Sequence, residues 1–125
     1  MTEKVVFTQT VTEEMLAVNV GSGSLRVLAT PTVCALFEKA AVQLAQQFLP
    51  EDQTTVGCSI SVEHTAPTPL GMQVTITAEM TAHEGRNFSF ELMAEDEAGV
   101  CASGTHSRVA VSSEHFQQKA DAKAK

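Results

Sequence analysis

Hydrophobic residues between positions 28 and 48 recur around most of the circumference of one predicted helix. Its polar stripe, at the three- and four-residue spacing of a single helix face, consists of Lys39, Gln43, Gln46 and Gln47. Thr30 and Pro31 stand where an N-cap and a first helical residue are favoured, and Pro50 stops the helix. A helix with so little polar surface is buried on most sides, so we expect it at the centre of the fold.

The rest of the chain is patterned as strands. Residues 4–11 form the first predicted strand, and four strands with period-two alternation follow the helix, over residues 56–64, 72–82, 88–94 and 100–112. This order favours an α+β fold in which one curved antiparallel sheet wraps around one long central helix. A sheet of that size covers only part of the helix, so we expect a second copy of the chain to complete its burial.

The length of 125 residues fits one domain, which we predict over residues 1–116. The remaining segment, residues 117–125, reads QQKADAKAK and contains no core-forming residue beyond alanine. We therefore predict a flexible C-terminal tail there.

Charge and cysteine usage narrow the function classes. A net charge of −7 and a pI near 4.9 argue against nucleic-acid and anionic-membrane partners. No apolar run reaches the length of about 20 residues that a transmembrane helix needs, and no secretory signal is visible at the N-terminus. Cys34, Cys58 and Cys101 are odd in number and far apart, which suits small buried side chains in a reducing, cytoplasmic compartment.

Three polar residues stand in unusual places. Glu38 is flanked at helical spacing by apolar residues, Thr30 begins the helix, and His64 ends the inward face of a strand. Each has a structural explanation of its own: an ion-paired carboxylate, an N-cap and a core histidine. Arg108 and His106 are most simply surface residues. Together, the first three supply the carboxylate, hydroxyl and imidazole that hydrolytic catalysis uses. No metal-ligand spacing or phosphate-binding loop occurs, so we predict no metal and no cofactor.

Four longer segments carry a family resemblance. They read ATPTVCALFEKAA, TTVGCSISVEHTAPTPLG, EGRNFSFELMAEDEAG and SGTHSRVAV. The most specific features are the Thr30-to-Glu38 spacing, the HTAPTPLG segment and the GTHSR motif. In these the chain resembles the hotdog-fold thioesterases, specifically the group of the fluoroacetyl-CoA thioesterase, over residues 21–116.

The resemblance implies a fold, an activity and a set of site residues. It implies a hotdog fold whose two subunits join their sheets in a homodimer, with a tetramer as a further assembly. It implies an acyl-CoA thioesterase with Thr30, Glu38 and His64 as catalytic residues, and Gly57 and Arg108 as substrate-binding residues. The N–H groups of Thr32 and Val33, or the backbone at Gly57, would then stabilise the oxyanion.

Several alternatives stay open on the sequence. Attack by Thr30 or Glu38 and activation of water are equally compatible with these residue types. A non-catalytic dimer that binds acyl thioesters would keep the fold, and a hotdog dehydratase would act on related substrates. No aromatic residue lies between Thr8 and Phe37, where the fluoroacetyl-specific enzyme has its phenylalanine lid, so we expect a different or broader acyl specificity.

Overall fold

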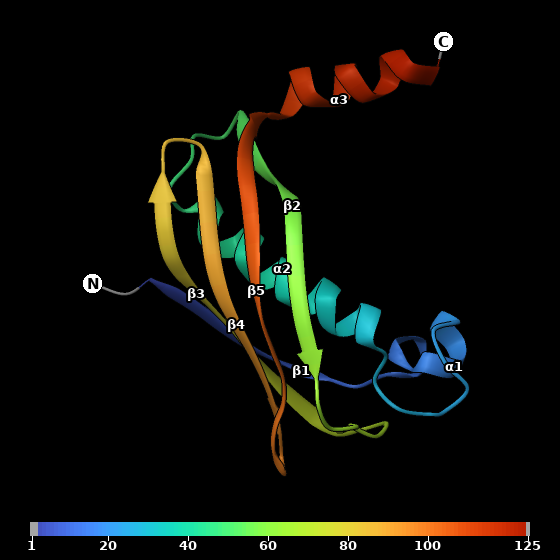
Figure 1. Cartoon of the computed structure of the whole chain (residues 1–125). Helices are drawn as coiled ribbons and strands as arrows, with labels where there is room; N and C mark the ends of the chain where they lie inside the picture. The colour runs from blue at the N-terminus through green and yellow to red at the C-terminus, as the bar shows by residue number, and fades with distance from the viewer. Residues whose placement is uncertain (1–2, 125) are drawn as a thin grey trace.

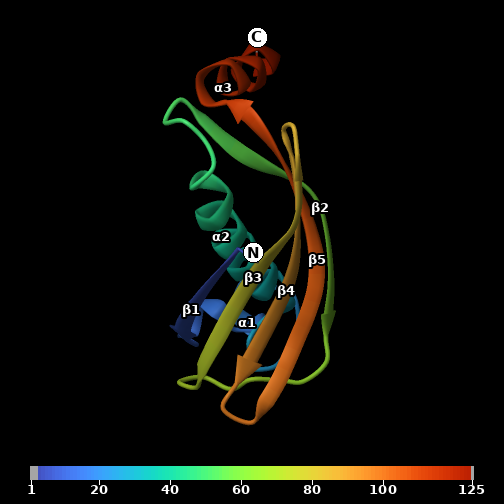
Figure 2. The ribbon, with the colours of Figure 1, turned by 90° about the vertical axis from the view of Figure 1, so that its left-hand side faces the viewer.

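The computed structural model describes residues 3–124 and consists of a curved antiparallel sheet with a long helix on its concave side (Figures 1 and 2). The strands are β1 (Lys4–Thr10), β2 (Gln53–His64), β3 (Gln73–Glu84), β4 (Asn87–Asp96) and β5 (Gly99–Ser112). They lie in the order β1-β3-β4-β5-β2, and all neighbours are antiparallel. The predicted α+β arrangement of one curved sheet around one long helix is confirmed. Strand β2 forms one edge of the sheet.

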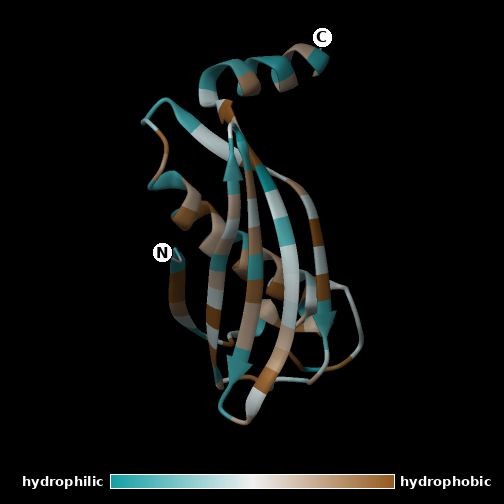
Figure 3. Ribbon diagram, turned by 60° about the vertical axis from the view of Figure 1, so that its left-hand side comes forward, coloured by the Kyte–Doolittle hydropathy of each residue, from teal (hydrophilic) through white to brown (hydrophobic). Residues whose placement is uncertain are grey.

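The long helix is α2 (Thr30–Gln46), which begins and ends close to the predicted bounds. One face of α2 is buried against the sheet, and it is formed by Val33, Leu36, Phe37, Ala40, Ala41, Leu44 and Ala45. This three- and four-residue spacing matches a single helix face, and burying a side chain such as Phe37 stabilises the fold by about 1.5–3 kcal/mol. Sheet residues such as Ile76 and Phe90 complete the same core. Hydropathy alternates along the strands in Figure 3, as the period-two pattern predicted.

Burial of α2 is less complete than the sequence suggested. Cys34, Glu38 and Val42 are only half-buried, and they form a row with a spacing of four residues beside the buried face. Gln46 continues this row and donates a hydrogen bond to the carbonyl of Gln53 at the start of β2. The incompletely covered side of the helix therefore borders the free edge of the sheet.

A β-bulge in β2 changes the predicted inward face. The register between β2 and β5 shifts between Gly57 and Ser59, so Cys58 is the extra residue. Cys58 is exposed and Cys34 is half-buried, so the prediction of three buried cysteines is correct for Cys101 alone. Period-two reasoning failed at Cys58 because one inserted residue turns every later side chain to the opposite face.

A short segment before α2 packs against the end of β2. It contains a 3-10 turn (Glu13–Met15) and the short helix α1 (Ala17–Val20). Bridges from Leu16 to Leu28 and from Val27 to Pro69 hold this segment beside the loop after β2 (Figure 1). This segment therefore covers one side of the N-terminus of α2.

The chain ends in the helix α3 (Ser113–Asp121), followed by a 3-10 turn (Ala122–Ala124). Ser112 caps α3 by accepting a hydrogen bond from the N–H of His115. The helix has no buried residue and stands clear of the sheet (Figures 1 and 2). The predicted boundary between residues 116 and 117 falls within α3, and the division into a domain and a tail stays a prediction. No helix among residues 3–124 is both long enough and apolar enough to cross a membrane.

Candidate active site

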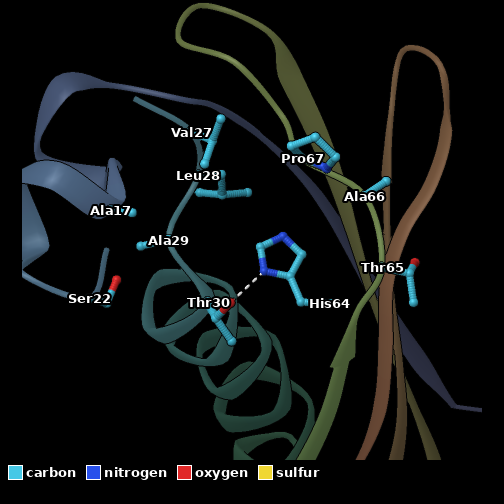
Figure 4. A pocket seen from close by; sticks show the side chains of 10 residues that line it. All are labelled: Ala17, Ser22, Val27, Leu28, Ala29, Thr30, His64, Thr65, Ala66 and Pro67. Carbon is cyan, nitrogen blue, oxygen red and sulfur yellow. Dashed lines mark hydrogen bonds between the residues drawn. The ribbon is translucent and has the colours of Figure 1, made fainter. Parts of the chain in front are cut away.

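The Thr30 hydroxyl and the His64 imidazole form a hydrogen bond of 2.7 Å between Oγ1 and Nδ1 (Figure 4). Thr30 is the first residue of α2, and His64 is the last residue of β2. The predicted role of Thr30 as N-cap is wrong, because Ala29 occupies the cap position and makes no side-chain bond there. The threonine hydroxyl is directed to the imidazole instead. A hydroxyl and an imidazole in direct contact form the basic unit of nucleophilic catalysis.

Burial lowers the pKa of His64 below the ordinary histidine value of 6.5. The ring is therefore neutral near pH 7, and its Nδ1 is able to accept the threonine proton. The other ring nitrogen, Nε2, is buried and has no hydrogen-bond partner among the described residues. In Figure 4 it faces the space between Leu28 and Pro67.

An open-sided pocket of about 260 Å³ surrounds this pair. It is lined by Ala17, Ser22, Val27, Leu28, Ala29, Thr30, His64, Thr65, Ala66 and Pro67. The first turn of α2 supplies a backbone donor beside it, because the Thr32 N–H has no partner among residues 3–124. The Val33 N–H is excluded as a free donor, since it donates to the carbonyl of Ala29 at 3.0 Å.

A second polar cluster surrounds the Arg108 guanidinium. Arg108 is 6% exposed, and its Nε and Nη2 donate to the hydroxyl and the carbonyl of Thr55 at 2.7 and 2.9 Å. Its Nη1 lies 3.0 Å from Glu38 Oε2 and 3.1 Å from His106 Nε2. Every nitrogen of the guanidinium is therefore engaged, and Arg108 ties α2, β2 and β5 together at this point.

His106 has a defined tautomer in this cluster. Its Nδ1 lies 2.7 Å from the carbonyl oxygen of Ser59, which accepts hydrogen bonds only, so Nδ1 carries the proton. Its Nε2 then accepts from Arg108. Burial, reinforced by the charge of Arg108, lowers the pKa of His106, so the ring is neutral. The prediction of His106 and Arg108 as surface residues is wrong, because they are 4% and 6% exposed.

Gly57 allows Glu38 to approach β2. A Cβ atom at this position would lie 2.7 Å from Glu38 Oε2 and 3.4 Å from Arg108 Nη1. Any larger residue would therefore displace the carboxylate. A hollow of about 260 Å³ beside it is lined by Glu38, Gly57, Cys58, Ser59, Ile60 and His106.

The five predicted site residues thus fall into two clusters within one chain. Thr30 joins His64, whereas Glu38 joins Arg108 and Gly57. Eight residues of α2 separate Thr30 from Glu38, which corresponds to about 12 Å along the helix axis. The Glu38 side chain is 42% exposed, so the expectation of a buried carboxylate is wrong for the single chain. Sequence reasoning also missed Thr55 and the buried position of His106. The available signal was the spacing of His106 and Arg108, because residues two apart on a strand share one face.

The family model that matches this chain describes a fluoroacetyl-CoA-specific thioesterase, and the match covers residues 11–114. The chain belongs to this thioesterase family. A curated relative, the fluoroacetyl-CoA thioesterase of Streptantibioticus cattleyicolor, is 39% identical over 93 residues, which are 74% of this chain and 67% of that protein.

Solved structures agree with the family assignment. A solved structure of the fluoroacetyl-CoA thioesterase has 31% sequence identity and a TM-score of 0.91, over 97% of this chain and 94% of that one. A hot-dog-like protein from Thermanaerovibrio acidaminovorans is 24% identical, with a TM-score of 0.87 over 96% and 89% of the two chains, and supports the fold alone. The predicted hotdog fold and thioesterase family are therefore confirmed.

Proposed function

We propose that this protein is an acyl-CoA thioesterase that hydrolyses a small acyl thioester to a carboxylate and CoA. Thr30, His64 and Glu38 are its catalytic residues, and Gly57 and Arg108 are its substrate-binding residues. The observation that carries the proposal is the 2.7 Å contact between Thr30 Oγ1 and His64 Nδ1 at the wall of a pocket. Membership of a thioesterase family supplies the substrate class.

The first step transfers the acyl group to the enzyme. Thr30 Oγ1 attacks the thioester carbonyl carbon while His64 Nδ1 accepts the hydroxyl proton. The carbon–sulfur bond then breaks, and the CoA thiolate takes the proton back from His64. The products of this step are free CoA and an acyl ester of Thr30.

The N-terminus of α2 is suited to stabilise the oxyanion of this step. The free Thr32 N–H and the positive end of the helix dipole lie next to Thr30, where negative charge develops on the carbonyl oxygen. Losing one such donor typically lowers the rate by about 10²–10³-fold. Because Thr32 contributes a backbone group, this element depends on helix geometry and not on a side chain.

The second step needs the carboxylate, and a homodimer provides it. The free edge β2 and the half-covered row of Cys34, Glu38 and Val42 lie on the same side of the chain. Two copies that pair their β2 strands antiparallel about a two-fold axis between Ile60 and Ser61 would place Gly57 opposite His64 of the partner subunit. The Glu38 cluster of one subunit would then face the Thr30–His64 pair of the other.

In that arrangement Glu38 completes the turnover. Its carboxylate accepts a proton from water while the water oxygen attacks the acyl–Thr30 ester. The ester carbon–oxygen bond then breaks, Thr30 takes the proton back from Glu38, and the released carboxylic acid loses its own proton to solvent. Glu38 Oε2 is held by Arg108, so the carboxylate has a fixed position for this role.

The three cysteines are free, in keeping with our placement of the enzyme in the reducing cytoplasm.

The lining of the pocket bears on the acyl specificity. The pocket of about 260 Å³ is open on one side in the single chain, and the partner subunit would close it. Its lining residues include no phenylalanine. We therefore infer a small acyl group and a site without a fluorine-selective gate.

The test is release of thiol from a panel of short acyl-CoA esters, with acetyl-CoA and fluoroacetyl-CoA among them. Thr30→Val and His64→Ala should each lower kcat by about 10²–10⁴-fold, as expected when a nucleophile or its base is lost. Mass spectrometry of the quenched enzyme should detect an acyl group on Thr30. Tight binding of the esters without turnover would refute catalysis and favour the binding dimer, and a fully active Thr30→Val would refute the covalent route.

A further inference from the structure

A group of basic and aromatic side chains lies at the end of β5, away from the Thr30–His64 pocket of the same chain. We call it the C-terminal cluster, and it comprises Arg86, His115, Phe116 and Lys119. With Val111 and Ser112 these residues line a hollow of about 250 Å³. The proposed hydrolysis uses none of them.

The charge of this cluster is unusual for the chain. The protein carries 15 acidic residues against 8 lysines and arginines. Two of those cations are already paired, Arg26 with Glu13 and Arg108 with Glu38. Neither Arg86 nor Lys119 forms a salt bridge within residues 3–124. The C-terminal cluster is thus a local positive site on an acidic protein, which would attract an anion that the remaining surface repels.

The two acidic residues within α3 are hydrogen-bonded to glutamines of the same helix and not to the cations of the cluster. Glu114 Oε1 accepts a hydrogen bond at 3.3 Å from Gln118, and Asp121 Oδ1 accepts one at 3.0 Å from Gln117. Arg86 comes from the turn between β3 and β4, and its carbonyl accepts a hydrogen bond from the N–H of Ala110 at 2.8 Å. Two cations from different elements therefore converge on one hollow.

Phe116 adds an aromatic surface to the cluster. Its side chain is 44% exposed on a helix that buries no residue, so packing within the chain does not explain it. A second hollow of about 270 Å³ adjoins it and is lined by Phe116, Lys119, Ala120 and Lys123. An exposed ring flanked by cations matches the needs of a nucleobase attached to phosphates.

We propose that the C-terminal cluster binds the phosphorylated nucleotide end of CoA, with Arg86 and Lys119 at the phosphates and Phe116 under the adenine. This assignment rests on the proposed function, because it takes acyl-CoA as the substrate. Arg86 offers a fork of donors that fits phosphate oxygens, and Lys119 acts as a point charge. His115 and Ser112 supply further polar groups at the same hollow.

The dimer would bring this cluster to an active site. Ser112 pairs with Gln53 at the start of β2, whereas His64 ends that strand. When identical strands pair antiparallel, the start of one lies beside the end of the other. The C-terminal cluster of one subunit would therefore lie near the acyl pocket of its partner. The pantetheine arm of CoA would bridge the two.

The experiment compares two thioesters with the same acyl group in the full-length enzyme. Acetyl-CoA carries the nucleotide, whereas S-acetyl-N-acetylcysteamine presents the same reacting bond without any phosphate. The double variant Arg86→Gln/Lys119→Gln should raise KM for acetyl-CoA by about tenfold, with kcat unchanged, as expected for two lost phosphate contacts at an exposed site. Its kinetics on the truncated thioester should match those of the wild type.

Matched controls separate this site from general charge effects. Lys119→Gln and Lys4→Gln each remove one positive charge. Lys4 is exposed on β1, at the edge of the sheet opposite β2, so Lys4→Gln should keep the wild-type KM for acetyl-CoA. Phe116→Ala should raise KM for acetyl-CoA alone. An unchanged KM in the double variant, or an equal rise for both thioesters, would overturn the assignment.

Failure of the proposed function has a different signature. A wild-type protein that hydrolyses neither thioester would refute the thioesterase proposal. Titration calorimetry with 3′-phosphoadenosine 5′-diphosphate would still test the cluster, because binding should be present in the wild type and lost in the double variant. Equal binding, or no binding to the wild type, would overturn it.

Discussion

Complementation between inactive subunits provides the sharpest test of the shared site. Thr30 and Glu38 are on the same helix but eight residues apart, so about 12 Å of α2 separates them in one chain. Thr30→Ala removes one half of the site, and Glu38→Gln removes the other without changing the size of the side chain. Each variant alone should form inactive homodimers.

Mixed dimers should regain activity in a defined proportion. If each site takes Thr30 from one subunit and Glu38 from the other, a mixed dimer has one site with both changes and one intact site. Random mixing should then restore about a quarter of the wild-type activity, because half of the dimers are mixed and each has one intact site of two. A dimer purified through two different affinity tags should reach about half.

The assay is thiol release from acetyl-CoA after the two variants are unfolded together, refolded and separated by their tags. A mixture of wild type with the Thr30→Ala variant, refolded in the same way, controls for recovery. If purified mixed dimers stay as inactive as the parents while this control recovers, each site lies within one subunit. The dimer geometry proposed here would then be refuted.

Three further outcomes follow from the clusters. Gly57→Ala should lower kcat, because the added methyl would push the Glu38 carboxylate away from its place against Arg108. Gly104→Ala would instead meet the backbone of β2 and should lower the urea midpoint more than Gly57→Ala does. Arg108→Lys should destabilise the protein by about 2–3 kcal/mol in urea unfolding, because one ammonium group cannot replace the buried fork of donors that binds Thr55. An unchanged urea midpoint would contradict a stabilising role for these hydrogen bonds. Burial lowers the pKa of His64 and His106 from 6.5, so the unfolded chain binds more protons as pH falls below that value. Stability should therefore be fully present above pH 6.5 and fall as pH approaches the lowered pKa values, and urea titrations showing a rise in that window would refute this assignment.

Most of the fold was predictable from periodicity. The helix over residues 28–48 and the five strands correspond to α2 and β1–β5, because their hydrophobic patterns are long and regular. The bulge at Cys58 was not predictable, since a single extra residue leaves no local signal in an alternating pattern. The helix α3 was missed because its helical spacing lacks a core-facing side. The polar sequence alone resembled a solvated tail.

The candidate site was only partly predictable. Thr30, Glu38 and His64 were selected as polar residues in unusual places, and the family resemblance added Gly57 and Arg108. Their separation into two clusters depends on how α2 crosses β2, which sequence spacing does not specify. His106 was predicted to be a surface residue because a histidine between polar neighbours gives no sign of burial. In the structure it is buried on β5, and its Nδ1 contacts the carbonyl oxygen of Ser59 on β2.

The anchoring of Arg108 on three secondary-structure elements has a consequence for the carboxylate beside it. A side chain whose charge must swing into place during a reaction spends part of the barrier on that movement. Here the guanidinium is immobilised by Thr55 and His106 before any substrate arrives, so its electric field at Glu38 is already set. In the hydrolysis that we propose, the carboxylate would therefore act from a fixed orientation, with little reorganisation needed at the moment of bond breaking.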